Sequence, residues 1–188
     1  MARFGVVLDA CSLVPITLAD TLLSVAENEL YQPLWSERIL DETSRTLKRV
    51  HPNKNALRFE ARITTMRQAF PEALVHGWED LESGIAERWP DPNDAHVVAA
   101  AIRGRAELIV TFNLKDFPRD LLLKYGLHAV SPDDFLLDLF DLNRDGVLEA
   151  IRTQAQRTNN PALEFLLVIE SLTKYAPKFC ETVLAATA

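Results

Sequence analysis

The sequence predicts an α/β fold in which helices flank a central parallel sheet, followed by a C-terminal helical appendage. Short apolar runs alternate with longer segments of helical periodicity as far as Val130, and this alternation is typical of parallel α/β sheets. Beyond Pro132 only helical patterns occur. The length of 188 residues suits one domain, or one domain with an addition.

Short apolar runs bounded by turn residues are predicted to be the strands. The first run is closed by Asp9, and one of the later runs follows Pro71. The predicted strands, in chain order, are Phe4–Leu8, Tyr31–Trp35, Ala73–Trp78, Leu108–Thr111 and Leu127–Val130.

The segments between these runs carry apolar residues at helical spacing. Ser36 is predicted to be the N-cap of one helix, and Gly126 is predicted to end another. The predicted helices, in chain order, are Pro15–Glu27, Ser36–Val50, Asn53–Phe70, Leu81–Trp89, Asp91–Gly104 and Phe117–Tyr125.

Four further helices are expected in the C-terminal part, at residues 133–140, 144–157, 161–174 and 177–187. Asn159-Asn160-Pro161 and Ala176-Pro177 separate the last three, because proline breaks a helix. We therefore expect a first domain over residues 1–140 and a helical appendage over residues 141–188.

Composition narrows the possible partners and compartments. The net charge of -7 argues against non-specific nucleic-acid binding driven by bulk charge, so any nucleic-acid contact needs a local basic patch. Cys11 and Cys180 are the only cysteines and stand at opposite ends of the chain, which suits a reducing, cytoplasmic compartment. No apolar run approaches the ~18 residues that a membrane span requires, so no membrane partner is expected.

Acidic side chains are predicted to gather at one edge of the sheet. Asp9 ends the first strand, Asp116 follows the strand 108–111, Asp94 lies in the first turn of a helix, and Glu42 lies on the helix after the second strand. In open parallel sheets, ligands collect beyond the carboxyl ends of the strands. Like charges at one site are costly without a cation, and oxygen ligands suit Mg²⁺ or Mn²⁺. Such an ion can polarise a phosphoryl oxygen and activate water.

Each acidic residue also has a purely structural interpretation. Asp91 before Pro92 is typical of an N-cap, and we interpret it as the cap that aims Asp94. Asp94 itself could serve the helix dipole instead of an ion. Asp9 could merely start a turn, and Glu42 could be solvated surface.

The neighbouring polar residues have open alternatives as well. Ser12 could bond Asp9 or cap the following helix. Thr111 could orient Asp116 or be an ordinary strand residue. Asn113 and Asp116 could be loop or capping residues, and His96 could point towards the site or pack elsewhere.

Basic residues accompany Glu42 on its helix. Arg38, Glu42, Arg45 and Arg49 recur at i, i+4, i+7 and i+11, and therefore share one stripe. One interpretation is ion pairing with Glu42, worth only tenths of a kcal/mol. The other is that Arg38, Arg45 and Arg49 form a phosphate-facing edge beside the acidic site.

Four short motifs contain the acidic residues and their polar neighbours. They are Leu8-Asp9-Ala-Cys-Ser12, Ile39-Leu-Asp-Glu42-Thr43, Asp91-Pro-Asn-Asp94 with the alanine-rich helix, and Thr111-Phe-Asn113-Leu-Lys-Asp116-Phe-Pro118. Together these motifs resemble the PIN-domain ribonucleases, and among these the VapC-type toxins of bacterial type II toxin–antitoxin pairs. The resemblance covers about residues 2 to 135, and the helical tail is similar to that of one PIN subfamily. A related subfamily often has Asp where this chain has Asn93, a position expected to support the ion rather than bind it.

This resemblance implies a three-layer PIN-like fold and a Mg²⁺- or Mn²⁺-dependent endoribonuclease. Its acidic quartet maps onto Asp9, Glu42, Asp94 and Asp116, supported by Ser12, Thr111 and Asn113. An RNA substrate, a cognate antitoxin and a homodimer are the implied partners. The alternatives are a catalytically silent PIN scaffold that acts as an interaction module, and a small-molecule phosphatase, against which the lack of a phosphate-binding loop argues.

Overall fold

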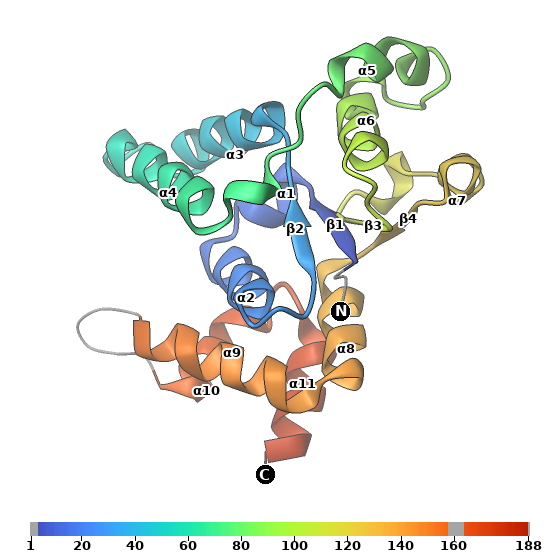
Figure 1. The fold of residues 1–188 in the computed structure, drawn as a ribbon. Helices are drawn as coiled ribbons and strands as arrows, with labels where there is room; N and C mark the ends of the chain where they lie inside the picture. Colours follow the sequence, from blue (N-terminus) through green and yellow to red (C-terminus); the bar gives the residue numbers. More distant parts are fainter. Residues whose placement is uncertain (1–3, 158–163, 188) are drawn as a thin grey trace.

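Four short parallel strands form the central sheet of the computed structural model, which describes residues 4–157 and 164–187 (Figure 1). The strand order is β2-β1-β3-β4, with β1 and β3 in the middle. All three neighbouring pairs are parallel, and Leu8 lies opposite Val110 in the central pair. Four of the five predicted strands are thereby confirmed, as β1 Gly5–Leu8, β2 Gln32–Leu34, β3 Leu108–Val110 and β4 His128–Val130.

The strand predicted at Ala73–Trp78 is wrong. Pro71–Ala73 forms a short 3-10 turn, η1, and only an isolated bridge joins Leu74 to Trp35. Gly77 then adopts a left-handed conformation with φ of 69°, which turns the chain out of the extended direction. The segment therefore contacts the end of β2 without extending the sheet.

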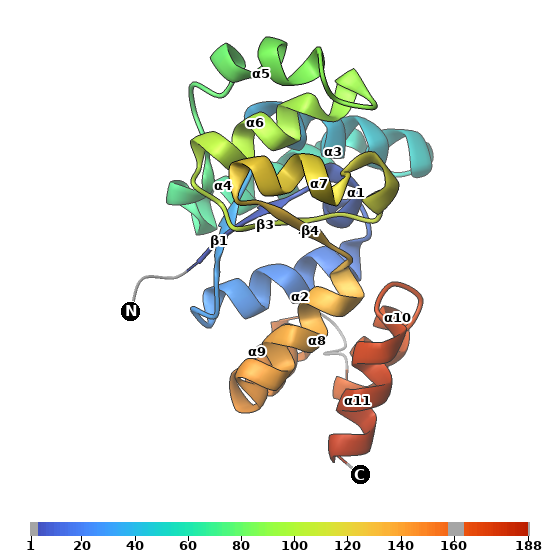
Figure 2. The same ribbon diagram turned by 90° about the vertical axis from the view of Figure 1, so that its right-hand side faces the viewer.

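Helices cover both faces of the sheet, as Figure 2 shows. Helices α3, α6 and α7 lie on one face, whereas α2 and α8 lie on the other. The predicted three-layer architecture is therefore confirmed. Up to β4 the helices are α1 Ala10–Leu13, α2 Ile16–Glu27, α3 Glu37–Val50, α4 Ala56–Ala69, α5 Glu79–Ala86, α6 Ala95–Arg103 and α7 Arg119–Leu122, with short 3-10 turns η2 Pro92–Asp94, η3 Leu114–Asp116 and η4 Leu123–Tyr125.

The start of α3 shows how the sequence determines one of these elements. The hydroxyl of Ser36 accepts a hydrogen bond of 3.2 Å from the amide of Ile39, which confirms the predicted N-cap. Leu40 and Leu47 face the core from the same side of the helix. The Ser36 cap fixes where α3 begins, and the buried leucines fix which side of α3 faces the core. Glu42 therefore takes a defined, half-exposed position on this helix.

The C-terminal helices α8 Pro132–Leu142, α9 Arg144–Arg157, α10 Phe165–Leu172 and α11 Pro177–Thr187 extend the layer formed by α2. The start of the predicted helix 161–174 and the break at Asn159-Asn160-Pro161 lie outside the described residues. The other predicted C-terminal helices are confirmed.

Side-chain bonds tie the C-terminal helices to the sheet domain and to one another. The hydroxyl of Thr21 on α2 donates to Gln154 on α9 at 2.8 Å. The buried carboxylate of Asp133 on α8 accepts from the amides of Lys178 and Phe179 on α11, at 3.2 and 2.9 Å. One buried apolar cluster runs through both parts of the chain, and the division at residue 141 stays a prediction.

Over residues 4–157 and 164–187, every helix is either too short or too polar to cross a lipid bilayer.

Candidate active site

Asp9 is held at the carboxyl end of β1 by two neighbouring side chains. The hydroxyl of Thr111 donates to Asp9 Oδ2 at 2.7 Å, and the thiol of Cys11 donates to the same oxygen at 3.0 Å. One predicted alternative was that Thr111 orients Asp116, but its hydroxyl donates directly to Asp9 instead. Because Leu8 pairs with Val110, the residues that follow them, Asp9 and Thr111, meet at the edge of the sheet.

Cys11 has a structural role that was not predicted. Its sulfur also accepts from the amide of Phe112 at 3.2 Å. Burial, followed by the negative charge of Asp9, raises the pKa of the Cys11 thiol to about 12, so the thiol remains a neutral donor. The carboxylate of Asp9 therefore accepts hydrogen bonds from two donors, and the Asp9 residue is only 7% exposed.

Ser12 stabilises the sheet edge instead of Asp9. Its buried hydroxyl donates to the carbonyl of Val110 at 3.0 Å, and its amide donates to the carbonyl of Asp9 at 2.9 Å. Both predicted roles of the Ser12 side chain, a bond to Asp9 and a helix cap, are therefore wrong. The carbonyl of Val110, which also accepts from the amide of Asp9 at 3.1 Å, lies within reach of the first turn of α1 and takes the Ser12 hydroxyl as a second donor.

Asp94 stands where three other acidic residues act on it. Burial, and then the charges of Asp9, Asp91 and Asp116, raise the pKa of Asp94 from 3.8 to about 6, while His96 lowers it. Asp9, Asp91 and Asp116 therefore lie near enough to Asp94 for their charges to act on it. The assignment of Asp9, Asp94, Asp116 and Glu42 as ligands stays a prediction.

Asp91 has the capping role that was predicted for it. Its carboxylate accepts from the amide of Asn93 at 2.9 Å and from the side chain of Asn93 at 3.0 Å. The cap starts η2, which carries Asp94 directly into α6. Asn93 is exposed, and its side chain bonds to the capping residue Asp91 rather than to any of the four proposed ligands.

Asp116 lies at the end of η3 in the loop that follows β3. The indole of Trp89 donates to the main-chain carbonyl of Asp116 at 2.9 Å, and the ring of Trp89 packs edge-on against Phe117. Trp89 was not predicted to take part in the site. Asn113 makes no capping bond with its side chain, but its amide donates to Thr111 Oγ1 at 3.0 Å. Thr111 thus joins Asp9 to the loop that carries Asp116.

Glu42 is held by residues on both sides of its carboxylate. His96 Nε2 lies 3.3 Å from one oxygen, and Arg38 Nε donates to the other at 3.2 Å. Burial works to raise the pKa of Glu42, but the contacts with His96 and Arg38 outweigh it and lower that pKa below 4.5. These contacts therefore keep Glu42 as an anion. The alternative that Glu42 is only a solvated surface residue does not account for them.

His96 is the residue that connects Glu42 to the other carboxylates. It lies on α6 two positions after Asp94, it is 1% exposed, and its ring packs against Trp78. Its Nδ1 has no hydrogen-bond partner within the described part of the chain, and its Nε2 is the nitrogen that faces Glu42. The alternative that His96 points towards the site is confirmed by this contact.

The basic residues on α3 do not all follow one of the two interpretations, which were ion pairing with Glu42 and contact with phosphates. Arg38 forms ion pairs with Glu42 and Glu82, as the structural interpretation requires. Arg45 and Arg49 are exposed and line, with Glu42 and Thr46, an open cavity of about 330 Å³. These two guanidinium groups stand beside Glu42 and can be reached by a ligand in solution.

The donor set suits a hard divalent cation, although the carboxylates are not closed around one. Within residues 4–157 and 164–187, no three Asp, Glu, His or Cys side chains stand at metal-binding spacing. The donors are carboxylate oxygens, and the raised pKa of Asp94 records a repulsion that a cation would remove. The residues therefore fit such an ion in the chemistry of their donor atoms.

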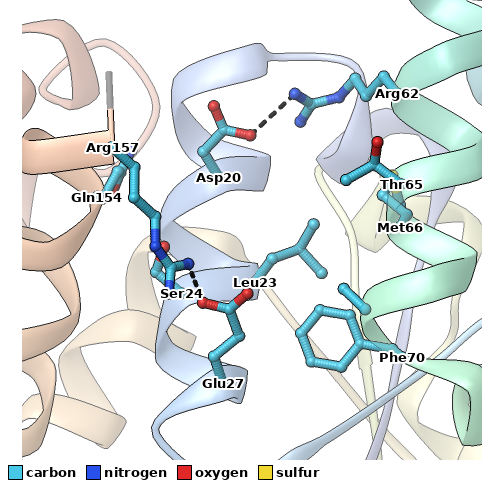
Figure 3. Close-up of a pocket in the computed structure, with 11 residues that line it drawn as sticks. Asp20, Leu23, Ser24, Glu27, Arg62, Thr65, Met66, Phe70, Gln154 and Arg157 are labelled. Carbon is cyan, nitrogen blue, oxygen red and sulfur yellow. Dashed lines mark hydrogen bonds and ion pairs between the residues drawn. The ribbon is translucent and has the colours of Figure 1, made fainter. Parts of the chain in front are cut away.

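A larger cavity lies on the opposite face of the sheet, away from these carboxylates. It has a volume of about 450 Å³ and lies among α2, α4 and α9 (Figure 3). Asp20 and Arg62 form an ion pair of 2.8 Å at one side, and Glu27 pairs with Arg157 at another. None of the predicted site residues lines this cavity.

The parallel sheet with helices on both faces places the protein in the class of three-layer α/β proteins, and its carboxyl edge is acidic. Comparison with known families then gives the particular family. The PIN domain model matches residues 5–115, which is over half of the chain, and the chain belongs to the PIN domain family.

Two further similarities concern the VapC type. Residues 132–185 match the VapC50 C-terminal domain. The chain is also 35% identical over 116 residues to the "Putative ribonuclease VapC50" of Mycobacterium tuberculosis, which covers 62% of this chain and 67% of that protein. No solved structure matches the chain. The predicted resemblance to PIN domains of the VapC type is confirmed.

Proposed function

We propose that the protein is a metal-dependent endoribonuclease that hydrolyses RNA phosphodiester bonds, and that it is the toxin of a bacterial type II toxin–antitoxin pair. The observation that carries this proposal is the raised pKa of Asp94, caused by burial and then by the charges of Asp9, Asp91 and Asp116, at the carboxyl edge of a PIN domain. The similarity to a protein named as a ribonuclease supports the choice of substrate.

We assign the binding of Mg²⁺ or Mn²⁺ to Asp9, Asp94 and Asp116, with Glu42 acting directly or through water. A bound divalent ion supplies Lewis acidity and an activated water at near-neutral pH. Around it, each carboxylate is prepared by the protein in a different way.

Hydrogen bonds and charge prepare these carboxylates. The hydroxyl of Thr111 and the thiol of Cys11 fix the orientation of Asp9. His96 and Arg38 keep Glu42 ionised. Asp94, with a pKa of about 6, is mostly ionised at neutral pH although burial and the neighbouring carboxylates oppose its charge. A cation is therefore the partner that this arrangement favours.

The substrate and partners follow from the surroundings and from the family. Arg45 and Arg49, both exposed, are placed to contact RNA phosphates beside Glu42. Single-stranded or looped RNA is the expected substrate, because its bases and backbone are accessible. The VapC resemblance suggests a homodimer in the cytoplasm and an antitoxin whose C-terminal segment fills the groove, with an arginine that pairs with the carboxylates.

The test is the cleavage of mixed cellular RNA with Mn²⁺ by the wild type and by a variant with Asp9→Asn and Asp94→Asn. The matched control carries Asp138→Asn and Asp141→Asn, which remove the same charge from exposed positions on α8. We expect the control to cut like the wild type, and the Asp9/Asp94 variant to lose cutting and to bind Mn²⁺ far more weakly in calorimetry. Equal cutting by all three proteins would sink the proposed site.

A catalytically silent scaffold is the second candidate, because the carboxylates of the described residues do not stand at metal-binding spacing. Under this alternative the wild type binds RNA or a protein partner but cuts no RNA at any Mg²⁺ or Mn²⁺ concentration. Metal-dependent cutting that requires Asp9 and Asp94 excludes it.

A further inference from the structure

The C-terminal helices reach the loop that carries part of the acidic site. The ring centroids of Phe112 and Tyr175 lie 6.4 Å apart, with the planes inclined at 53°. Phe112 belongs to the loop after β3, whereas Tyr175 belongs to the connection between α10 and α11. Figure 2 shows this connection on the same side of the molecule as α1, which follows the carboxyl end of β1. Two aromatic rings from distant segments therefore meet beside the carboxyl edge.

Phe112 is linked to Asp9 through a short chain of hydrogen bonds. Its amide donates to the sulfur of Cys11 at 3.2 Å, and this thiol donates to Asp9 at 3.0 Å. Its neighbours Thr111 and Asn113 are joined by a bond of 3.0 Å. The backbone under the Phe112 ring is thus fixed relative to Asp9, so a group that rests on this ring lies close to the carboxylates.

The ring of Phe112 remains open to solvent although a second ring lies next to it. Its exposed fraction is 41%, and that of Leu114 two residues later is 42%. Tyr175 is half-buried and anchored on the C-terminal core. A single exposed apolar residue is ordinary on a protein surface, but an aromatic pair built from two segments beside a catalytic edge offers a stacking surface.

Positive charge accompanies the rings. The ammonium group of Lys174 lies 5.4 Å from the centre of the Tyr175 ring. Lys115, in the same loop as Phe112, is exposed and has no ion-pair partner among the residues that the structure describes. The chain as a whole is acidic, with a net charge of -7, so these cations mark a local site for an anion. Exposed Arg45 and Arg49 lie beyond Glu42, in another part of the same edge.

We propose that Phe112, Tyr175 and Lys174 form a platform that stacks the bases of single-stranded RNA and contacts its backbone next to the acidic site. Aromatic rings with adjacent cations are the general means of holding single strands without reading their sequence. The proposal rests on the proposed ribonuclease function and deepens it, because it gives the C-terminal helices a part in substrate binding.

The first measurement is the affinity for a short, fluorescently labelled single-stranded RNA, followed by anisotropy at low salt with EDTA so that metal-dependent cutting is prevented. Phe112→Ala and Tyr175→Ala should each weaken binding by about fivefold to a hundredfold, the range expected for the loss of one stacked base. Phe112→Trp and Tyr175→Phe keep an aromatic ring and should bind like the wild type.

The control is Leu184→Ala, which removes an apolar side chain of comparable exposure, 42%, on α11. It should leave affinity unchanged. Lys174→Gln should reduce the dependence of log affinity on log salt by about 0.7, as expected for one lost phosphate contact to a single strand. A duplex RNA of the same sequence should bind all ring variants equally, since its bases are already stacked. Thermal unfolding of each variant identifies any that fail to fold.

Three outcomes separate this proposal from the one on which it rests. If folded Phe112→Ala and Tyr175→Ala bind single strands like the wild type while cutting still needs Asp9 and Asp94, the platform is wrong and the ribonuclease stands. If the wild type neither binds nor cuts RNA, both proposals fall. If the ring variants lose only a protein partner and keep RNA affinity, the surface is a protein-docking site and the RNA platform is overturned.

Discussion

Replacing Asp94 with Asn should stabilise the metal-free protein near neutral pH. In the folded chain the pKa of Asp94 is raised from 3.8 to about 6 by burial and by Asp9, Asp91 and Asp116. Because the folded-state pKa lies above the unfolded value, the folded state binds more protons between about pH 4 and pH 6. The wild type therefore loses stability as the pH rises through this window, and Asn at position 94 avoids that loss.

The size of the effect follows from the shift in pKa. A rise from 3.8 to about 6 corresponds to ~3 kcal/mol before screening. Asp94 is only partly buried, and solvent screening reduces this value to ~1.5 kcal/mol. The lost attraction between the carboxylate and the start of α6 opposes the gain by ~0.5 kcal/mol. A net stabilisation of about 1 kcal/mol therefore remains, or ~2–4 °C in Tm for a chain of this size.

The assay is urea denaturation in EDTA, near neutral pH and again below about pH 4, where the advantage of Asp94→Asn should vanish. Asp138→Asn removes the same formal charge from an exposed position on α8 and should change stability little at either pH. Addition of Mn²⁺ should stabilise the wild type more than Asp94→Asn. If Asp94→Asn were destabilising by the same amount at both pH values, the proposed repulsion among the carboxylates would be refuted.

The remaining predictions concern single hydrogen bonds that position the site or the tail, each measured by urea denaturation with circular dichroism. Thr111→Val removes the donor to Asp9 and the acceptor of the Asn113 amide, and should cost ~2 kcal/mol; Thr111→Ser keeps the hydroxyl and should recover most of the loss. Ser36→Ala removes the cap of α3 and should cost ~1 kcal/mol, whereas unchanged stability would show that the cap is not needed. Asp133→Ala leaves two α11 amides without their acceptor and should cost ~2 kcal/mol, against no loss for the exposed neighbour variant Asp138→Ala.

Local patterns were sufficient for most of the fold. Apolar runs such as Gly5–Leu8 are buried on both faces, and the capped, periodic segment of α3 could form nothing but a helix in this context. The segment 73–78 has the composition of a strand, yet a strand also needs a neighbour to pair with. Trp35 supplies only one bridge before Gly77 turns the chain, and composition alone cannot show that limit.

The candidate site was predictable in its acidic residues but not in the contacts that support them. Asp9, Asp94 and Asp116 could be placed together because parallel strands end at one edge. The partner of Thr111 depends on the register of β1 against β3, which the sequence does not display. The bond between Cys11 and Phe112 depends on the same register. The contacts of Trp89 with Asp116 and of His96 with Glu42 depend on how distant helices pack, which the sequence does not display either.

The shared core of the sheet domain and its C-terminal helices has a consequence for biosynthesis. Thr21 finds its partner in Gln154, and α2 packs against α9 as well as beneath the sheet. A growing polypeptide can therefore complete the underside of its sheet only after α9 has left the ribosome. Until then, the strands that end in Asp9 and Thr111 lack part of their support. The acidic edge should thus become ordered late in synthesis, so that a partially made chain carries all four carboxylates without yet holding them in place.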